Sequence, residues 1–185
     1  MLAWKNLDSM ADENENSTRL VGQLLYSERF DDFYSARLTP DQEKSYVFCT
    51  GNDLEARFPT AQNFTIVELG FGAGLGFLAA AHLWRETATA DARLNFISIE
   101  KYPLERDKLR SFLRQFPQWE KLSETLLAHW PVATPGFHRI DLPDTGITLT
   151  LIFSEVLGAL QQLEANVDAW FLDGFSPAKN PAMWR

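Results

Sequence analysis

The sequence predicts a single α/β domain built around a parallel β-sheet. The chain has 185 residues, about the size of one compact domain, and 45% of them are apolar, which is enough to fill one large core. From residue 64 onward, short runs rich in β-branched residues alternate with helix-like runs, as in proteins with parallel sheets. A glycine-rich turn joins the first of these strands to the first helix.

The first part of the chain, residues 1–60, predicts a polar leader followed by an irregular, partly extended cap. Aromatic, extended-looking runs occur at residues 27–34 and 45–49, with a turn signal at Pro40 between them. The leader contains no apolar run, so we expect no signal peptide.

The second part, residues 61–185, begins with two strand-helix pairs. Residues 64–69 predict a strand and residues 75–85 a helix. Residues 94–99 predict the next strand, and residues 103–116 a helix that starts at a proline.

The third core strand is predicted within a hairpin. Residues 136–142 and 147–153 are strand-like runs joined by a Pro-Asp-Thr-Gly turn. Residues 155–163 predict a helix, and residues 168–172 a short, nearly all-apolar strand of the kind that is buried on both faces. Such sheets bind their ligands beyond the carboxyl ends of the strands.

The composition excludes several classes of protein. With a net charge of −8, no overall positive field attracts nucleic acid, so a nucleic-acid partner needs a local basic patch. Residues 101–114 offer one, although an ordinary solvated amphipathic helix explains residues 103–114 better, because their basic and acidic positions are mixed. Cys49 is the single cysteine, so we expect no disulfide, no zinc cluster and no metal, in a reducing cytoplasmic setting. No run approaches the roughly 20 apolar residues of a membrane span.

Glycine alternates with other residues directly after the first strand. Glu68, Gly70, Gly72 and Gly74 form the pattern E-x-G-x-G-x-G. Glycine lets the backbone turn tightly and approach a ligand closely. A dinucleotide-binding loop has the pattern G-x-G-x-x-G, and here the third glycine falls one place early. The spacing instead resembles motif I of the class I S-adenosylmethionine-dependent methyltransferases, although an ordinary strand-to-helix turn also has such glycines.

Acidic residues end the next two strands. Glu100 predicts a bound ribose, because a carboxylate accepts hydrogen bonds from both ribose hydroxyls. Adenosine and NAD both carry that ribose, so Glu100 leaves the cofactor open. Methyltransferases of this class often have an acid that accepts from the adenine amino group after the third strand, and Ser154-Glu155 stands there. Either acid alone is equally typical of a helix start, where the helix dipole favours it.

Asp173 ends the fourth strand and opens the loop Asp-Gly-Phe-Ser-Pro. Amino-group methyltransferases carry an Asp/Asn-Pro-Pro-aromatic loop at this place. A carboxylate there accepts an N–H of the amine and aligns its nitrogen with the methyl group. We therefore predict that Asp173 is catalytic.

Three blocks, residues 28–35, 46–58 and 168–181, resemble the methyltransferase domain of the bacterial tRNA 5-methylaminomethyl-2-thiouridine biosynthesis proteins, the MnmC family. The resemblance implies a Rossmann-like class I S-adenosylmethionine-dependent methyltransferase sheet, with S-adenosylmethionine as cofactor and tRNA as partner. It implies methyl transfer to the aminomethyl group of a wobble uridine, giving 5-methylaminomethyl-2-thiouridine.

Site residues follow from the motifs and the resemblance together. The predicted cofactor-binding residues are Glu68, Gly70, Gly72, Gly74, Glu100, Ser154, Glu155 and Asp173. The resemblance assigns the substrate to Phe30, Asp31, Asp32, Tyr34, Phe175 and Pro177. The family often has Gly-Asp where this chain has Ser154-Glu155, which makes the adenine contact one methylene longer.

Class I methyltransferases have seven strands, and the patterns here account for the first four. We therefore expect a sheet without its C-terminal strands, with an unpaired apolar edge at residues 168–172. FAD would enter only with a C-terminal oxidase domain in a longer protein. Two alternatives stay open: an FAD- or NAD-linked Rossmann oxidoreductase acting on CH–NH groups, which Glu100 allows, and an inactive fragment. The oligomeric state and the tRNAs bound are not predicted.

Overall fold

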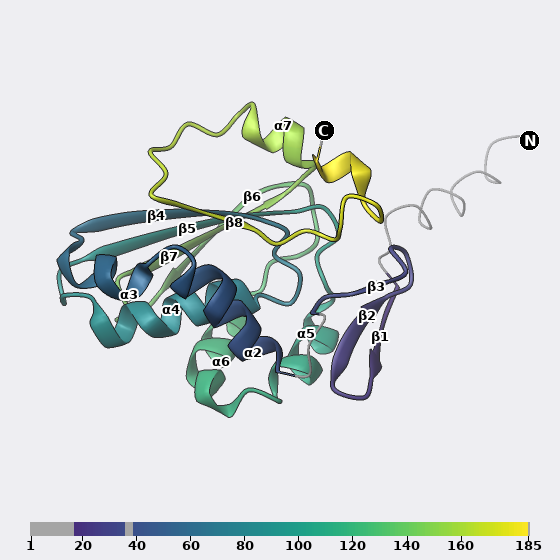
Figure 1. Cartoon of the computed structure of the whole chain (residues 1–185), viewed down its shortest axis with the longest axis horizontal. Coiled ribbons are helices and arrows are strands. Elements are labelled where there is room, and N and C mark those ends of the chain that lie inside the picture. The colour runs from purple at the N-terminus through teal and green to yellow at the C-terminus, as the bar shows by residue number, and fades with distance from the viewer. Residues whose placement is uncertain (1–16, 36–38, 185) are drawn as a thin grey trace, which may run out of the picture.

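The computed structural model describes residues 17–35 and 39–184, which form a main five-stranded sheet with helices on both faces and a small three-stranded sheet beside it (Figure 1). The leader predicted before residue 17 lies outside the described residues. None of the described helices is long and apolar enough to cross a membrane.

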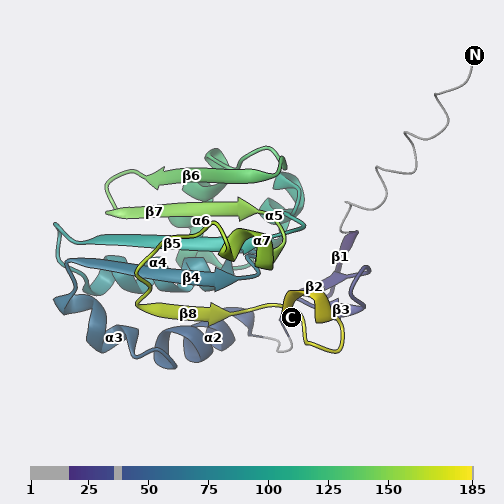
Figure 2. The same ribbon diagram turned by 90° about the horizontal axis from the view of Figure 1, so that it is seen from above.

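The main sheet has the predicted parallel core. Its strand order is β6-β7-β5-β4-β8 (Figure 2). The parallel strands are β4 (Asn63–Leu69), β5 (Arg93–Glu100), β7 (Ile147–Phe153) and β8 (Ala169–Leu172), and β6 (Gly136–Leu142) pairs antiparallel with β7. The parallel core and the β6–β7 hairpin are therefore confirmed.

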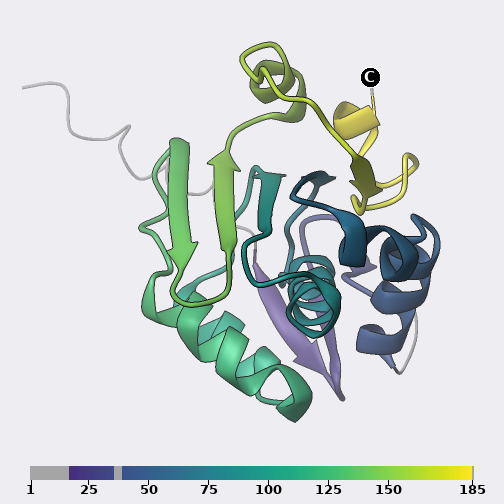
Figure 3. The same ribbon diagram turned by 90° about the vertical axis from the view of Figure 1, so that its left-hand side faces the viewer.

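Helices cover the two faces unequally (Figure 3). One face carries α4 (Leu75–Thr87), α5 (Arg106–Leu113) and α6 (Glu120–Ala128), and the other carries α7 (Val156–Leu160). Short 3-10 turns occupy Phe58–Thr60, Pro117–Trp119 and Pro181–Trp184.

Two of these helices differ from the prediction. The helix expected over 103–116 begins only at Arg106, because the backbone N–H of Tyr102 donates to the Glu100 carboxylate (2.7 Å) and bends the chain there. The sequence patterns did not indicate α6, which packs on α4 and α5 through Leu122 and Leu126.

The N-terminal region is more regular than predicted. It contains an antiparallel sheet, beyond the carboxyl ends of the parallel strands (Figures 1 and 2), followed by helical segments. Its elements are β1 (Thr18–Val21), β2 (Leu24–Ser27), β3 (Asp32–Phe33), α2 (Pro40–Lys44), a π-helix (Ser45–Thr50) and α3 (Leu54–Arg57). The extended conformation expected for residues 45–49 is wrong, because Phe48 and Cys49 are buried on one side of a helical turn. The division at residue 60 stays a prediction.

Aromatic side chains dominate the core between the sheet and α4. Phe77 and Phe171 each meet the ring of Phe96 edge-on, with centroids 5.2 and 5.7 Å apart. Phe58 packs against Trp84 of α4 at 4.9 Å, which attaches the segment before β4 to the same core. A smaller cluster lies on the opposite face, near α7: Leu69, Ile99, Ile152 and Ala159.

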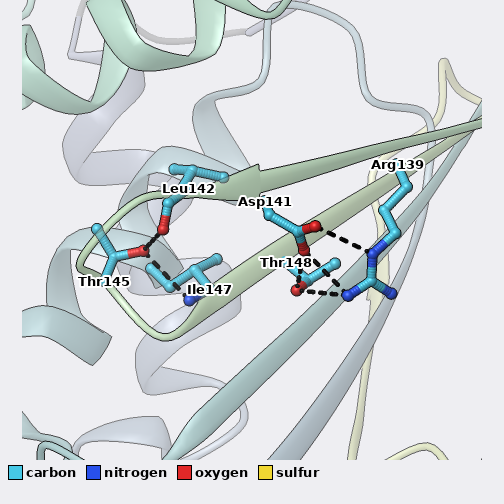
Figure 4. A network of polar contacts seen from close by, with 6 residues as sticks. All are labelled: Arg139, Asp141, Leu142, Thr145, Ile147 and Thr148. Carbon is cyan, nitrogen blue, oxygen red and sulfur yellow. Dashed lines mark hydrogen bonds and ion pairs between the residues drawn. The ribbon is translucent and has the colours of Figure 1, made fainter.

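The two edges of the main sheet are finished differently. At the β6–β7 hairpin, Arg139, Asp141 and Thr148 form a polar network (Figure 4), with Thr148 Oγ1 2.8 Å from Asp141 Oδ1. At the other edge, β8 buries Phe171 and leaves Trp170 44% exposed. Among the described residues, one face of β8 is exposed, so the prediction that this strand is buried on both faces is wrong.

Candidate functional site

A cavity of ≈ 260 Å³ lies at the carboxyl ends of the parallel strands. Its walls come from the glycine-rich loop after β4, the ends of β5 and β8, and the N-terminal region. Nine of the predicted site residues line it: Phe30, Asp32, Tyr34, Gly70, Gly72, Glu100, Glu155, Asp173 and Phe175.

The glycines of the loop permit close contacts that other residues would block. Gly70 has φ +92°, and a Cβ there would lie 2.8 Å from the carbonyl oxygen of Asp173. Gly72 has φ +53°, and its Cβ would lie 2.9 Å from the Tyr34 ring. Both dihedrals belong to the left-handed region that favours glycine. The loop thus brings the end of β8 and the N-terminal region against one backbone segment.

Glu100 is held by backbone amides. Its Oε2 accepts from the N–H of Gly72 (2.9 Å), and its Oε1 accepts from the N–H of Tyr102 (2.7 Å). Burial raises the pKa of the Glu100 carboxyl, and these backbone bonds oppose that rise. Each oxygen keeps a further lone pair, so the fixed carboxylate can still accept from a ligand in the cavity.

Asp173 forms an ion pair with Lys44, a residue that the sequence reasoning did not single out. The side chains are 20% and 9% exposed. Burial raises the pKa of Asp173 to about 6, although the Lys44 ammonium pulls it down. Asp173 is therefore ionised at neutral pH and becomes protonated as the pH falls through about 6.

Glu68 lies beneath the loop rather than in the cavity wall. Its Oε2 accepts from Ser98 Oγ (2.6 Å), while its Oε1 has no partner among the described residues. Gly76 leaves room for this carboxyl, because a Cβ at that position would collide with Oε1. Burial, followed by the charge of Asp173, raises the pKa of Glu68 well above its usual value. The carboxyl therefore supports the loop from below as a buried, proton-binding group.

Another part of the cavity wall is aromatic. Phe30 stacks on Phe175 with ring centroids 4.6 Å apart, and Tyr34 meets Phe175 edge-on at 5.0 Å. Tyr102 extends the wall at 5.8 Å from Phe30. Behind it, the indole N–H of Trp184 donates to the Phe175 carbonyl (2.8 Å). The two segments assigned to the substrate thus meet in one surface.

The remaining predicted residues lie at the margin or outside the lining. Glu155 lines the cavity and pairs with Lys101. Asp31 is bound to Lys179 (2.7 Å) on an exposed face. Outside the lining are Glu68, Gly74, Ser154, Pro177 and Asp31.

Several polar lining residues were not among the predicted site residues, including Lys44, Lys101 and Tyr102. Lys101 and Tyr102 directly follow Glu100, so their position after a strand end was a usable signal. Lys44 had no such signal, because it meets Asp173 only through the tertiary fold.

Residues 117–185 match a family described as S-adenosyl-L-methionine-dependent methyltransferases. Proteins named tRNA 5-methylaminomethyl-2-thiouridine biosynthesis bifunctional protein MnmC are similar over most of this chain. The one from Chromobacterium violaceum is 47% identical over 159 residues, which are 84% of this chain and 24% of that protein. Those from Hydrogenovibrio crunogenus and Legionella pneumophila are 45% and 41% identical, over 86% and 87% of this chain and 24% and 27% of theirs.

The chain thus spans about a quarter of the length of these curated relatives. A solved structure, MNMC2 from Aquifex aeolicus, superposes with a TM-score of 0.70 and 19% identity, covering 100% of this chain and 61% of that one. This likeness supports the fold: a Rossmann-like sheet of the methyltransferase type.

Proposed function

Since the chain belongs to the MnmC methyltransferase family, we propose that it binds S-adenosylmethionine in the cavity and methylates the aminomethyl group of a tRNA wobble uridine. The reaction converts 5-aminomethyl-2-thiouridine into 5-methylaminomethyl-2-thiouridine, and we place it in the cytoplasm. The observation that carries the proposal is the contact between the glycine loop and the Asp173 backbone, which brings the loop predicted to bind the cofactor and the carboxylate predicted to accept the amine to one cavity.

The residues present fit this cofactor. Gly70 and Gly72 line the cavity, and the absence of a Cβ at each lets the Asp173 backbone and the Tyr34 ring close tightly around the loop. Glu100, oriented by two amides, would accept from the ribose hydroxyls, and Glu155 would face the adenine amino group. When bound, the sulfonium of S-adenosylmethionine supplies an electrophilic methyl group.

Asp173 would hold the amine that receives the methyl group. Its carboxylate accepts an N–H and so directs the nitrogen lone pair along the line of transfer. As the amine gains positive charge, the same carboxylate stabilises that charge at short range. This role needs the ionised form, so activity is expected to fall as the pH drops through about 6.

The tRNA would contact two further surfaces. The Phe30–Phe175 stack offers an apolar face for a nucleobase removed from its stack. Three arginines of the α5 region, Arg106, Arg110 and Arg114, line a second hollow of ≈ 460 Å³ between α5 and α6, and two glutamates of α6, Glu120 and Glu124, line it as well. Arginines on such a face bind phosphates and make the affinity dependent on salt.

Ligand-specific stabilisation tests the cofactor. S-adenosylhomocysteine at about 100 times its dissociation constant stabilises a folded protein by roughly 2.7 kcal/mol. We expect thermal unfolding of the 185-residue chain to shift upward by several degrees with this ligand and not with NADH or FAD. A shift with NADH or FAD alone would establish the oxidoreductase alternative, and no shift with any ligand would favour the inactive fragment.

Transfer of a labelled methyl group to tRNA carrying 5-aminomethyl-2-thiouridine tests the reaction. Asp173→Asn is expected to lower the rate at least ~100-fold while the affinity for S-adenosylhomocysteine stays within about threefold. Asp144→Asn, in the exposed β6–β7 turn, is the matched control and is expected to keep the rate. An unaltered rate in Asp173→Asn would remove Asp173 from the reaction.

A further inference from the structure

Lys44 is a buried lysine that belongs to no predicted motif. It is the last residue of α2, 7% exposed, and its ammonium contacts the Asp173 carboxylate across 129 positions of sequence. It also lies 5.5 Å above the Phe48 ring. A lysine is rarely buried unless it is paired, so the contact with Asp173 accounts for its position.

Carboxyl groups surround this lysine. Asp173 contacts it, and Glu68 and Glu100 act on the same site electrostatically from beneath the loop and from the end of β5. Glu43, the neighbour of Lys44 on α2, also acts on Asp173, and its Oε2 accepts from Ser35 Oγ (2.6 Å). Removing the Lys44 ammonium would therefore take away its attraction and leave Asp173 with the repulsion of Glu43 and Glu100.

The backbone around Lys44 fixes the pair in advance. The π-helix begins directly after Lys44, and the N–H of Gly51 donates to the carbonyl of Tyr46, five residues earlier (3.1 Å). Phe48 in this turn stacks on Phe171 with centroids 4.7 Å apart. Phe171 lies on β8, and Asp173 directly follows the end of that strand, so the lysine and the carboxylate are both anchored to β8. Single π-turns within helices often occur at functional sites.

We propose that Lys44 is a positioning residue, whose ammonium fixes the Asp173 carboxylate at the cavity wall as the acceptor for the substrate N–H. It acts through Asp173 and needs no contact with the substrate. The catalytic consequence rests on the proposed function, whereas the effect on Asp173 itself does not. An opposite charge at this range lowers a carboxyl pKa by ~1–3 units, so the loss of Lys44 is expected to protonate much of Asp173 at neutral pH.

The direct test is a titration of the Asp173 carboxyl carbon by ¹³C NMR, with Asp173→Asn identifying its resonance. In the unsubstituted chain we expect a midpoint near 6. Lys44→Gln is expected to raise it by at least about one unit, and Lys44→Arg to restore it. Lys101→Gln, at the lysine paired with Glu155 in the same cavity, is the matched control and is expected to leave it unchanged. An unchanged midpoint in Lys44→Gln would overturn the proposal.

Lys44→Gln leaves a buried carboxylate without its partner, so it can lose stability. If it unfolds, the double variant Lys44→Gln with Asp173→Asn is expected to refold, because the uncompensated charge is gone. A double variant that is as unstable as Lys44→Gln would show that Lys44 supports packing and does not position Asp173.

Methyl transfer gives the second readout. In Lys44→Gln, the acid limb of the profile of kcat against pH is expected to move up by at least about one unit, with Lys44→Arg close to the unsubstituted protein. A purely structural role would lower the rate equally at every pH. Absence of methyl transfer in the unsubstituted chain, with the NMR shift present, would reject the proposed function and keep the positioning of Asp173. Methyl transfer by the unsubstituted chain, with no shift of the Asp173 midpoint in Lys44→Gln, would support the proposed function and reject the positioning role of Lys44.

Discussion

The two walls of the cavity are held in different ways. The wall formed by the glycine loop and Glu100 is fixed by backbone, through amide bonds of 2.9 and 2.7 Å to one carboxylate. A second wall is fixed by side chains from distant parts of the chain, through the Lys44–Asp173 pair and the Phe30–Phe175 stack. A substitution can remove one side-chain contact and leave the others in place. A substitution that disturbs the backbone of the glycine loop is expected to affect every contact of that wall together. We call the first the cofactor wall and the second the substrate wall, after their proposed roles, and we expect them to respond separately to substitution.

Gly70→Ala is expected to have the largest effect, because Gly70 of the glycine loop contacts the backbone of Asp173, which belongs to the other wall. The added Cβ would press on the Asp173 carbonyl, and alanine disfavours φ +92°. We expect a loss of ~2–4 kcal/mol in unfolding free energy and loss of S-adenosylhomocysteine binding, measured by denaturation and calorimetry. Gly158→Ala on α7, whose Cβ would meet only Ser154 Oγ at 3.8 Å, is the control and is expected to be neutral. Equal effects of the two substitutions would contradict the close approach.

Glu100→Ala tests the cofactor wall alone. Loss of the charged acceptor is expected to weaken S-adenosylhomocysteine binding by ~1–3 kcal/mol, measured by calorimetry. The Asp173 wall stays in place, so the NMR midpoint of Asp173 is expected to move little and downward, because one repelling carboxylate is gone. Unchanged affinity would refute the ribose assignment.

Glu68→Gln tests the support beneath the loop. The folded-state pKa of Glu68 is raised above its unfolded value, so its contribution to stability is complete at low pH and declines as the pH rises between the two values. Glutamine imitates the protonated carboxyl. In the unsubstituted protein, this group makes the free energy of unfolding fall by up to ~1.4 kcal/mol per pH unit. We expect Glu68→Gln to lack that fall when both proteins are denatured between pH 5 and 8. A variant with the same pH slope as the unsubstituted protein would show that Glu68 is ionised in the fold.

Phe30→Ala tests the substrate wall alone and is expected to have the smallest effect. Loss of one stacked pair costs ~0.5–1.5 kcal/mol, so we expect KM for tRNA to rise by about threefold to tenfold. The affinity for S-adenosylhomocysteine is expected to stay constant. Phe137→Ala, on exposed β6, is the control in the same steady-state assay. A parallel loss of cofactor affinity in Phe30→Ala would show that the two walls are coupled.

The two walls also differ in how far the sequence predicted them. The glycine spacing and the acids at strand ends are local patterns, so Gly70, Gly72, Glu100 and Asp173 were placed correctly at one edge of the sheet. Their roles stay predictions. Lys44 was missed because its partner lies at the other end of the chain, where no local pattern points to it.

Local propensity also gave wrong conformations where tertiary packing decides. Residues 45–49 are rich in aromatic and β-branched types, yet they form a π-helix because Phe48 packs on Phe171. The start of α5 was predicted too early because the chain first wraps around the Glu100 carboxylate. Exposed and buried residues alternate along β8, but the sequence did not show this, because exposed Trp170 and buried Phe171 are both apolar. The alternation follows from the position of β8 at the edge of the sheet.

The hydrogen bond from Trp184 to the Phe175 carbonyl gives the substrate wall an optical reporter. Indole emission responds to the polarity and hydrogen bonding of its surroundings, so a nucleobase that stacks on Phe175 would change the fluorescence of Trp184. Cofactor entry at the backbone-held wall would leave that signal nearly constant. The chain has six tryptophans, so the difference between the unsubstituted chain and Trp184→Phe isolates this signal. Stopped-flow mixing of both with each ligand would then separate the arrival of the cofactor from the arrival of the nucleic acid in time, without any label added to the protein.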